Sequence, residues 1–199
     1  MSENAIKLVV GLGNPGANYG STRHNLGFMA LDALTVLLIG DTSQQGQKTP
    51  YKKVRCESLV HELEFESARL VLAKPQTFMN RSGNCVKGLL KHYNLSIEDV
   101  LVIHDDLDLP VQTLRIKMGG GHGGHNGLRS IIDSSGADFA RIKIGIGRPP
   151  GQMPAERYVL QELRGTALEE LKVDAARAAE AALAILTNGL LAAQNTFNG

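Results

Sequence analysis

The sequence lacks several features that would place it in a particular class of protein. It has no tryptophan and only two cysteines, Cys56 and Cys85. Two cysteines are too few for a disulfide framework, and their separation does not match metal-ligand spacing, so we interpret both as ordinary thiols. We find no apolar run of membrane-spanning length and no basic-then-apolar leader. The expected location is therefore cytoplasmic, or the matrix of an organelle after processing.

Net charge is also small, but it is unevenly distributed. The 199 residues carry a formal net charge of +1. Residues 113–148 contain six lysines and arginines against two aspartates, a local net charge of +4. A basic segment in a nearly neutral chain indicates either a localised anion site or a solvated strand face. Hydrophobic residues make up 43% of the chain, which at this length predicts one domain with a substantial core.

Glycine and asparagine are plentiful around an early histidine. Residues 11–25 follow an apolar run and precede apolar residues at helical spacing, which predict a helix over about residues 22–38 with Thr22 as N-cap. The glycines of residues 11–16 match the dinucleotide pattern G-x-G-x-x-G. In that motif the helix begins within the glycines and binds the pyrophosphate, whereas here it begins later. Dinucleotide binding is therefore the weaker interpretation, and His24 falls in the first turn of the predicted helix.

Periodicity predicts alternating strands and helices. We expect strands within residues 6–10, 51–60, 69–73, 100–103, 113–118 and 141–146. Helices are expected after an N-cap at Asn80 or Ser82, around 128–132, and over 166–188, with a polar loop at 40–50. Capping boxes are predicted for the pairs Ser96 with Asp99 and Thr166 with Glu169. The alternation predicts an α/β fold, a single three-layer domain with a twisted sheet flanked by helices.

Four of the predicted strands run into polar clusters. The first cluster contains Asn14 and His24, the second Asn80 and the third Asp105. The fourth is the glycine-rich run of residues 119–127. If the strand ends lie together, a histidine, a carboxylate and carboxamides surround one pocket. A histidine can take a proton from water, a carboxylate can fix its tautomer, and carboxamides can donate to a developing oxyanion. The set suits hydrolysis of an acyl bond without a covalent nucleophile.

A metal-dependent hydrolase is an alternative that uses some of the same residues. His104, Asp105, His122 and His125 are all metal-type ligands. However, His122 and His125 lie in flexible glycine sequence rather than on a helix, and no cysteine takes part. We therefore expect neither a metal nor another cofactor.

Six motifs occur together in this chain. They are GLGNPG (residues 11–16), TRHN (22–25), PQTFMNRSG (75–83), HDDLDLP (104–110), GGGHGGHNGL (119–128) and IGIG (144–147). This ordered set resembles the bacterial-type peptidyl-tRNA hydrolases and covers most of the chain to about residue 160. The resemblance implies one phosphorylase/hydrolase-like α/β domain over residues 1–199, with a mixed sheet. It also implies a metal-free monomer that cleaves the ester between peptide and tRNA, recycling tRNA from aborted translation.

The resemblance also implies roles for individual residues. His24 is the general base that activates water, Asp105 orients it, and Asn14 positions the carbonyl or water and stabilises the intermediate. The residues that match substrate-binding positions are Tyr19, Met79, Asn80, Gly123, His125 and Asn126. The glycine run fits this role independently, because a chain without side chains lets peptide and ribose approach its backbone.

The basic segment acquires a role through the same resemblance. Lys117, with Arg141 or Lys143 on one face of a strand, corresponds to a clamp on the tRNA 5′ phosphate and acceptor stem. Such contacts are independent of base sequence and weaken with salt. Lysine at position 143 stands where arginine is more usual, and it lacks the fork that grips phosphate. Residues 147–160 match a mobile lid-like segment. The alternative is an RNA-splicing scaffold like some plant organelle relatives, but a scaffold has no use for a base and its orienting acid.

Overall fold

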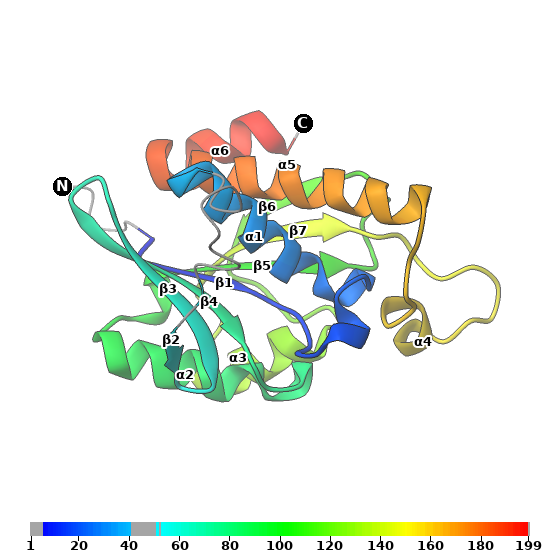
Figure 1. Ribbon diagram of the computed structural model, residues 1–199, viewed down its shortest axis with the longest axis horizontal. Coiled ribbons are helices and arrows are strands. Elements are labelled where there is room, and N and C mark those ends of the chain that lie inside the picture. The colour runs from blue at the N-terminus through cyan, green and yellow to red at the C-terminus, as the bar shows by residue number, and fades with distance from the viewer. Residues whose placement is uncertain (1–5, 41–50, 52, 199) are drawn as a thin grey trace.

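The computed structural model describes residues 6–40, 51 and 53–198. In this part of the chain, seven strands form one sheet in the order β2-β3-β4-β1-β5-β7-β6 (Figure 1). The predicted polar loop at residues 40–50 lies outside the described residues except for its first position.

The strands meet in both orientations, as expected for a mixed sheet. They are β1 (Leu8–Gly11), β2 (Lys53–Arg55), β3 (Ser58–Phe65), β4 (Ala68–Pro75), β5 (Val100–Asp106), β6 (Leu114–Met118) and β7 (Ala140–Gly145). Strand β1 is parallel to β4 and β5, and β5 is parallel to β7. Strands β2, β3 and β6 pair antiparallel with their neighbours. The carboxyl ends of the four parallel strands therefore share one edge of the sheet.

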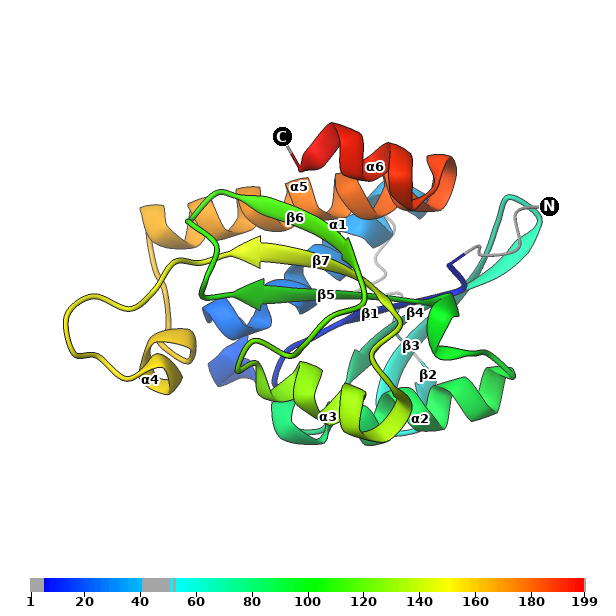
Figure 2. The same cartoon turned by 180° about the vertical axis from the view of Figure 1, so that it is seen from behind.

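Helices cover both faces of the sheet and complete the predicted three layers. One face carries α1 (Leu26–Ile39), α5 (Thr166–Asn188) and α6 (Leu190–Phe197), and the other carries α2 (Ser82–Tyr93) and α3 (Asn126–Ser135) (Figures 1 and 2). The short helix α4 (Ala155–Val159) lies beyond the carboxyl edge (Figure 2). Single 3-10 turns are η1 (Ala17–Tyr19), η2 (Arg23–Asn25), η4 (Met79–Arg81) and η5 (Ile97–Asp99).

The central strand β5 shows why this sequence forms a sheet that is covered on both faces. Its apolar residues alternate between two cores. Leu101 and Ile103 pack on the side of α1 and α5, whereas Val100 and Val102 pack on the side of α2 and α3. All four are fully buried. A continuous apolar strand of this kind is typical of a parallel strand with helices on both sides, and it ends at the polar residues of the site.

The capping side chains predicted at two helix starts were wrong. The helix expected over residues 22–38 divides into η2 and α1. Thr22 does occupy the N-cap position, that of η2, but its hydroxyl donates to the Tyr19 carbonyl at 2.9 Å and makes no capping bond. At α2, Arg81 occupies the N-cap position, and the Ser82 hydroxyl donates to the Met79 carbonyl. In each case a local turn takes the hydroxyl that would otherwise cap the helix.

Differences also occur in the hairpins and at the C-terminus. The strand expected over residues 51–60 is broken by a turn at Cys56 and Glu57, whose φ angles are 48° and 54°. Gly165, not Thr166, precedes α5, so the predicted capping box there was wrong, whereas the box at η5 is confirmed. Helix α5 does end at Gly189, where φ is 83°, but the chain then forms α6, which the sequence did not predict.

The glycine-rich run reaches the site by a different route from the one expected. Because β6 is antiparallel to β7, its last residue pairs with Ala140, the first residue of β7, at the edge opposite the carboxyl ends of the parallel strands. The chain after Met118 then passes back across the sheet to the start of α3 (Figure 2). The expectation that four strands end together was therefore wrong for β6, although the loop still delivers its last residues to the common edge.

Candidate active site

A cavity of about 660 Å³ lies at the carboxyl edge of the parallel strands. Segments after β1 and β4, the end of β5, the glycine-rich run and α4 all contribute to its wall. The predicted site residues that line it are Asn14, His24, Met79, Asn80, Asp105, Gly123, His125 and Asn126. All four polar clusters identified in the sequence therefore meet in one cavity.

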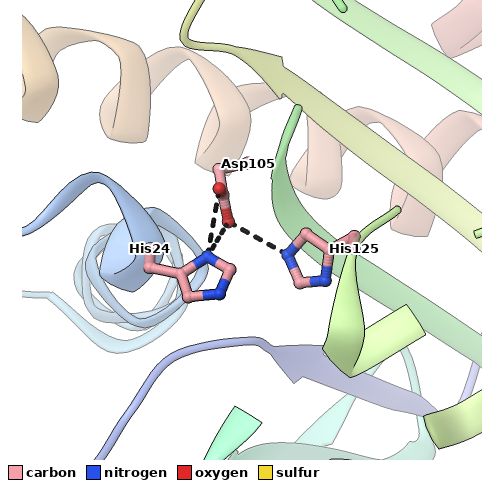
Figure 3. A group of neighbouring side chains, drawn as sticks. All are labelled: His24, Asp105 and His125. Atoms are coloured by element: carbon pink, nitrogen blue, oxygen red, sulfur yellow. Dashed lines mark hydrogen bonds and ion pairs between the residues drawn. The ribbon is translucent and has the colours of Figure 1, made fainter. Parts of the chain in front are cut away.

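His24 is held by the close approach of α1 to the sheet. At Gly27, an added Cβ would lie 2.3 Å from the Leu12 nitrogen and 2.4 Å from the Ile103 oxygen, so only glycine fits there. This contact brings η2 against the ends of β1 and β5. The His24 Nδ1 atom lies 3.0 and 3.1 Å from the two carboxylate oxygens of Asp105 (Figure 3).

This pairing defines the tautomer of His24. An ionised carboxylate can only accept hydrogen bonds, so Nδ1 donates, and in the neutral ring Nε2 keeps its lone pair on the far side (Figure 3). Burial by itself lowers the pKa of His24, but the charge and hydrogen bond of Asp105 outweigh it, so the net pKa is raised above 6.5. The ring is thus a stronger base than a free histidine.

A second histidine binds the same carboxylate. His125 Nε2 lies 3.1 Å from Asp105 Oδ1, and the rings of His125 and His24 have centroids 4.9 Å apart (Figure 3). Burial alone raises the pKa of Asp105, but the two histidines hold it well below its usual value, so the carboxylate stays ionised. The resemblance implied a substrate contact for His125, and sequence reasoning missed its contact with Asp105.

Asn14 is fixed by bonds that leave one group free for the cavity. Its Oδ1 accepts from the Met79 amide at 2.9 Å, and its own backbone exchanges two hydrogen bonds with the Asn25 side chain, at 2.9 and 3.0 Å. Because the Oδ1 atom is occupied, the Nδ2 group is the part of Asn14 available as a donor. Asn25 is buried and was not singled out from the sequence, where it falls in the first turn of the predicted helix.

The remaining predicted substrate contacts lie around the rim. Asn80 and Asn126 are exposed and line the cavity from the start of η4 and α3, whereas Met79 is buried. Tyr19 does not line the cavity, but its ring packs edge-on against Phe78, which does, with centroids 6.5 Å apart. Phe78 is 60% exposed. An aromatic pair thus extends the cavity on the side of η1.

The predicted basic face is only partly exposed. Lys117 pairs with Arg141 and Arg115 with Lys143 in the β6–β7 register, so the four do share one face. Lys117 is exposed, and Lys143 Nζ pairs with Asp106 at 2.7 Å. Arg141 is only 2% exposed, and its guanidinium donates to the carbonyls of Gly120, Gly121 and Ala137. The alternative of a solvated strand face is therefore wrong for Arg141, because the returning glycine run covers it.

The segment predicted to form a lid, residues 147–160, is anchored at one end. Tyr158 donates through its hydroxyl to the Ile146 carbonyl at 2.7 Å, and the Arg23 guanidinium lies 3.9 Å from the centre of its ring. Glu156, Val159 and Leu160 line the cavity near His24. Helix α4 therefore forms one wall of the cavity.

Comparison with known proteins settles the family. The family model described as peptidyl-tRNA hydrolase matches residues 8–199. Peptidyl-tRNA hydrolases of Rhodococcus opacus and Rhodococcus jostii are 45% and 44% identical to the chain, each over the whole of both sequences. The chain belongs to the peptidyl-tRNA hydrolase family. A crystal structure of peptidyl-tRNA hydrolase from Acinetobacter baumannii is 32% identical and superposes with a TM-score of 0.82, covering 100% of this chain and 97% of that one.

Membership in the peptidyl-tRNA hydrolases makes this chain an enzyme that hydrolyses peptidyl-tRNA. It also removes the dinucleotide interpretation, and the packing of the glycines gives the physical reason. An added Cβ at Gly11 would lie 2.2 Å from the Gly27 oxygen, and one at Gly13 would lie 2.7 Å from the Phe28 ring. These glycines let α1 approach the sheet. Helix α1 begins at Leu26, well after the motif.

For a peptidyl-tRNA hydrolase the grouping of histidines has a direct bearing on metal use. The ligand-type atoms that lie close together, within 4.8 Å, belong to His24, Asp105 and His125, not to the four residues considered from the sequence. His104 Nδ1 instead bonds to the Asp105 carbonyl at 2.7 Å, and His122 Nδ1 accepts from Gly124. In the cluster, both imidazoles direct a nitrogen at the carboxylate, which is the arrangement of a hydrogen-bonded base.

Within the described residues, no helix is long and apolar enough to cross a membrane.

Proposed function

We propose that His24 is the general base with which this peptidyl-tRNA hydrolase activates water. The observation that carries the proposal is the pair of contacts between His24 Nδ1 and the Asp105 carboxylate, at 3.0 and 3.1 Å. They leave Nε2 as the proton acceptor in a ring that lines the cavity. A base held in one tautomer beside a fixed anion is the arrangement that general-base hydrolysis requires.

The reaction then proceeds in two steps. Water bound at His24 Nε2 loses a proton to that nitrogen as its oxygen bonds to the ester carbonyl carbon, and the carbonyl oxygen becomes an oxyanion. The Asn14 Nδ2 group, held in place through Met79 and Asn25, donates to that oxyanion. When the bond between carbon and ribose oxygen breaks, the ribose oxygen takes the proton back from Nε2. Asp105 stabilises the imidazolium between the two steps.

The substrate is placed by the cavity rim and the basic strands. We propose that Asn80, Asn126 and the open backbone at Gly123 bind the peptide and the terminal nucleotide, with Met79 and Tyr19 as apolar contacts. Support comes from the position of these residues around the cavity and beside Phe78.

Phosphates of the acceptor stem are proposed to bind Lys117 and Lys143, on the face shared by β6 and β7. Arg141 supports this surface from beneath by fixing the carbonyls of the glycine run. Residues 147–160 are proposed to close over the peptide, because α4 lines the cavity. We also propose that the enzyme acts as a monomer in the cytoplasm, where translation provides peptidyl-tRNA.

Release of N-acetyl amino acid from acetyl-aminoacyl-tRNA tests the role of His24. The assay is run in a metal chelator with the native protein, with His24→Ala, and with His92→Ala as a matched control. His92 is an exposed histidine in the last turn of α2. We expect native and control rates to agree in chelator and the His24→Ala rate to fall by at least a thousandfold. Near-native cleavage by His24→Ala, or loss of native cleavage in chelator, would refute the proposal.

A further inference from the structure

The His125 ring is held so that only one of its nitrogens can carry a proton. Its Nδ1 atom accepts hydrogen bonds from the backbone amides of Gly127 and Leu128, at 3.1 and 3.3 Å, as the N-cap of α3. An atom that faces two N–H donors cannot itself donate. The proton of the ring is therefore on Nε2, which donates to Asp105 Oδ1.

Asp105 consequently serves two imidazoles whose roles differ. His24 must gain and lose a proton during each turnover, whereas the amides of α3 fix the His125 ring so that it donates through Nε2. Both rings bond to the same oxygen, Oδ1, at 3.0 and 3.1 Å. A hydrogen bond to a carboxylate neutralises part of its charge, so the two rings compete for one anion.

We propose that His125 is a positioning residue that limits the basicity of His24 by taking a share of the Asp105 carboxylate. The inference rests on the proposed function of His24 as the base. A base that stayed protonated near neutral pH could not accept a proton from water, so an unshared carboxylate would make His24 too basic to act. The His125 imidazole keeps Asp105 ionised, so that the carboxylate still orients His24. At the same time it weakens the attraction between that carboxylate and the proton on His24.

His104 supports this arrangement from behind. It is 1% exposed, its Nδ1 donates to the Asp105 carbonyl at 2.7 Å, and its ring meets the His125 ring edge-on with centroids 5.1 Å apart. Burial lowers the pKa of His104 to about 3. The ring against which His125 packs is thus neutral near neutral pH.

Other charged groups around the cluster are engaged elsewhere or lie at the rim. Asp106 is paired with Lys143, and Asp108 is paired with Arg148. The Arg23 guanidinium lies over the Tyr158 ring. Glu156 of α4 and His122 lie in the cavity wall, and His122 Nδ1 accepts from the Gly124 amide. None of these side chains has a hydrogen bond to Asp105 within the described residues, so the two imidazoles are the groups that divide its charge.

Two substitutions of His125 separate the hydrogen bond from the helix cap. In His125→Asn, the side chain still caps α3 but is too short to reach Asp105. In His125→Gln, the longer amide can still donate to Asp105. In His125→Asn we expect the acidic limb of the kcat/KM pH profile to move to higher pH by roughly 0.5–1 pH unit. This shift corresponds to part of the energy of one charge-assisted hydrogen bond, which Asp105 would lose from His125. The limb should stay near its native position in His125→Gln.

A purely structural role would give a different result. If His125 only holds the loop, His125→Asn lowers the rate at every pH without moving the limb, and that outcome overturns the inference. A downward movement, or equal upward movement in both variants, also overturns it. Should His125→Asn fail to fold, His125→Ser, which also caps helices and cannot reach Asp105, carries the same expectation.

A second readout does not depend on activity. NMR titration of the His24 ring in ¹³C-histidine-labelled protein should show the same upward shift in His125→Asn. The His24→Ala assay separates the two ideas. If His24→Ala is active, the proposed function fails. If His24→Ala is inactive but the limb of His125→Asn is unmoved, this inference alone fails.

Discussion

Replacing Asp105 by asparagine removes the charge beside His24 and leaves a side chain of the same shape. The carboxylate is 2% exposed and accepts from both imidazoles, so solvent cannot replace it. Two effects follow from the structure. The imidazolium formed during the reaction loses its counter-charge, and the resting His24 ring loses the group that raises its pKa.

The first effect is the larger. At the observed 3.0 Å between Nδ1 and Oδ1, the charge attraction is about 5.5 kcal/mol for an effective dielectric constant of about 20. The amide oxygen of asparagine still accepts a hydrogen bond of about 1 kcal/mol. The remaining energy of about 4.5 kcal/mol is an upper limit and corresponds to roughly 2,000-fold in rate. We therefore expect kcat to fall by a factor between about 100 and 2,000.

The second effect fixes the direction of the pH change. Without the carboxylate, burial dominates and lowers the pKa of His24 below 6.5. A ring with a lower pKa stays unprotonated to lower pH, so the acidic limb of kcat/KM moves to lower pH while the plateau falls. The assay is acetyl-aminoacyl-tRNA hydrolysis between pH 5 and 9, with Asp133→Asn on the exposed face of α3 as the charge-matched control. A limb that moves upward, or a plateau within threefold of native, would refute the reasoning.

Two further predictions concern the tRNA surface and the packing under His24. Lys117→Ala should weaken binding of tRNA substrates and make the slope of log affinity against log salt shallower by about 0.7–0.9. Cleavage of a minimal peptidyl-adenosine should be unchanged. Equal loss of activity on both substrates would contradict a phosphate contact. Gly27→Ala should cost about 3 kcal/mol and lower the Tm by roughly 6–12 °C, because its Cβ would meet backbone atoms of Leu12 and Ile103. A Tm within 2 °C of native in calorimetry would show that α1 can move away from the sheet.

Much of the fold follows from periodicity, since the patterns that predict strands record burial on two faces. Strand β5 is the clearest case, because its run of apolar residues needs helices on both sides. Such periodic patterns do not predict how the chain continues after the residue that ends a helix. Gly189 ends α5 as predicted, but a chain reversal at that glycine also permits α6 to begin at once.

The sequence predicted which residues gather in the candidate site, but not which of them contact one another. Polar residues at the ends of parallel strands converge by geometry, which is why His24 and Asp105 could be expected together. The glycine run carries no periodicity, so its return path across the sheet, which buries Arg141 and places His125 on Asp105, could not be read from the sequence. The support that Asn25 gives to Asn14 was hidden for a related reason, because a residue at a helix start does not reveal which loop it faces.

The central claim is that His24 is the group whose protonation switches the enzyme off. The most direct measurement compares two titrations of the native protein: the acidic limb of kcat/KM for acetyl-aminoacyl-tRNA, and the NMR titration of the His24 ring. We predict that the two midpoints coincide and lie above 6.5, because Asp105 raises the pKa of His24. A His24 midpoint below 6.5, or a titration of the ring across a range where the rate stays constant, would contradict it.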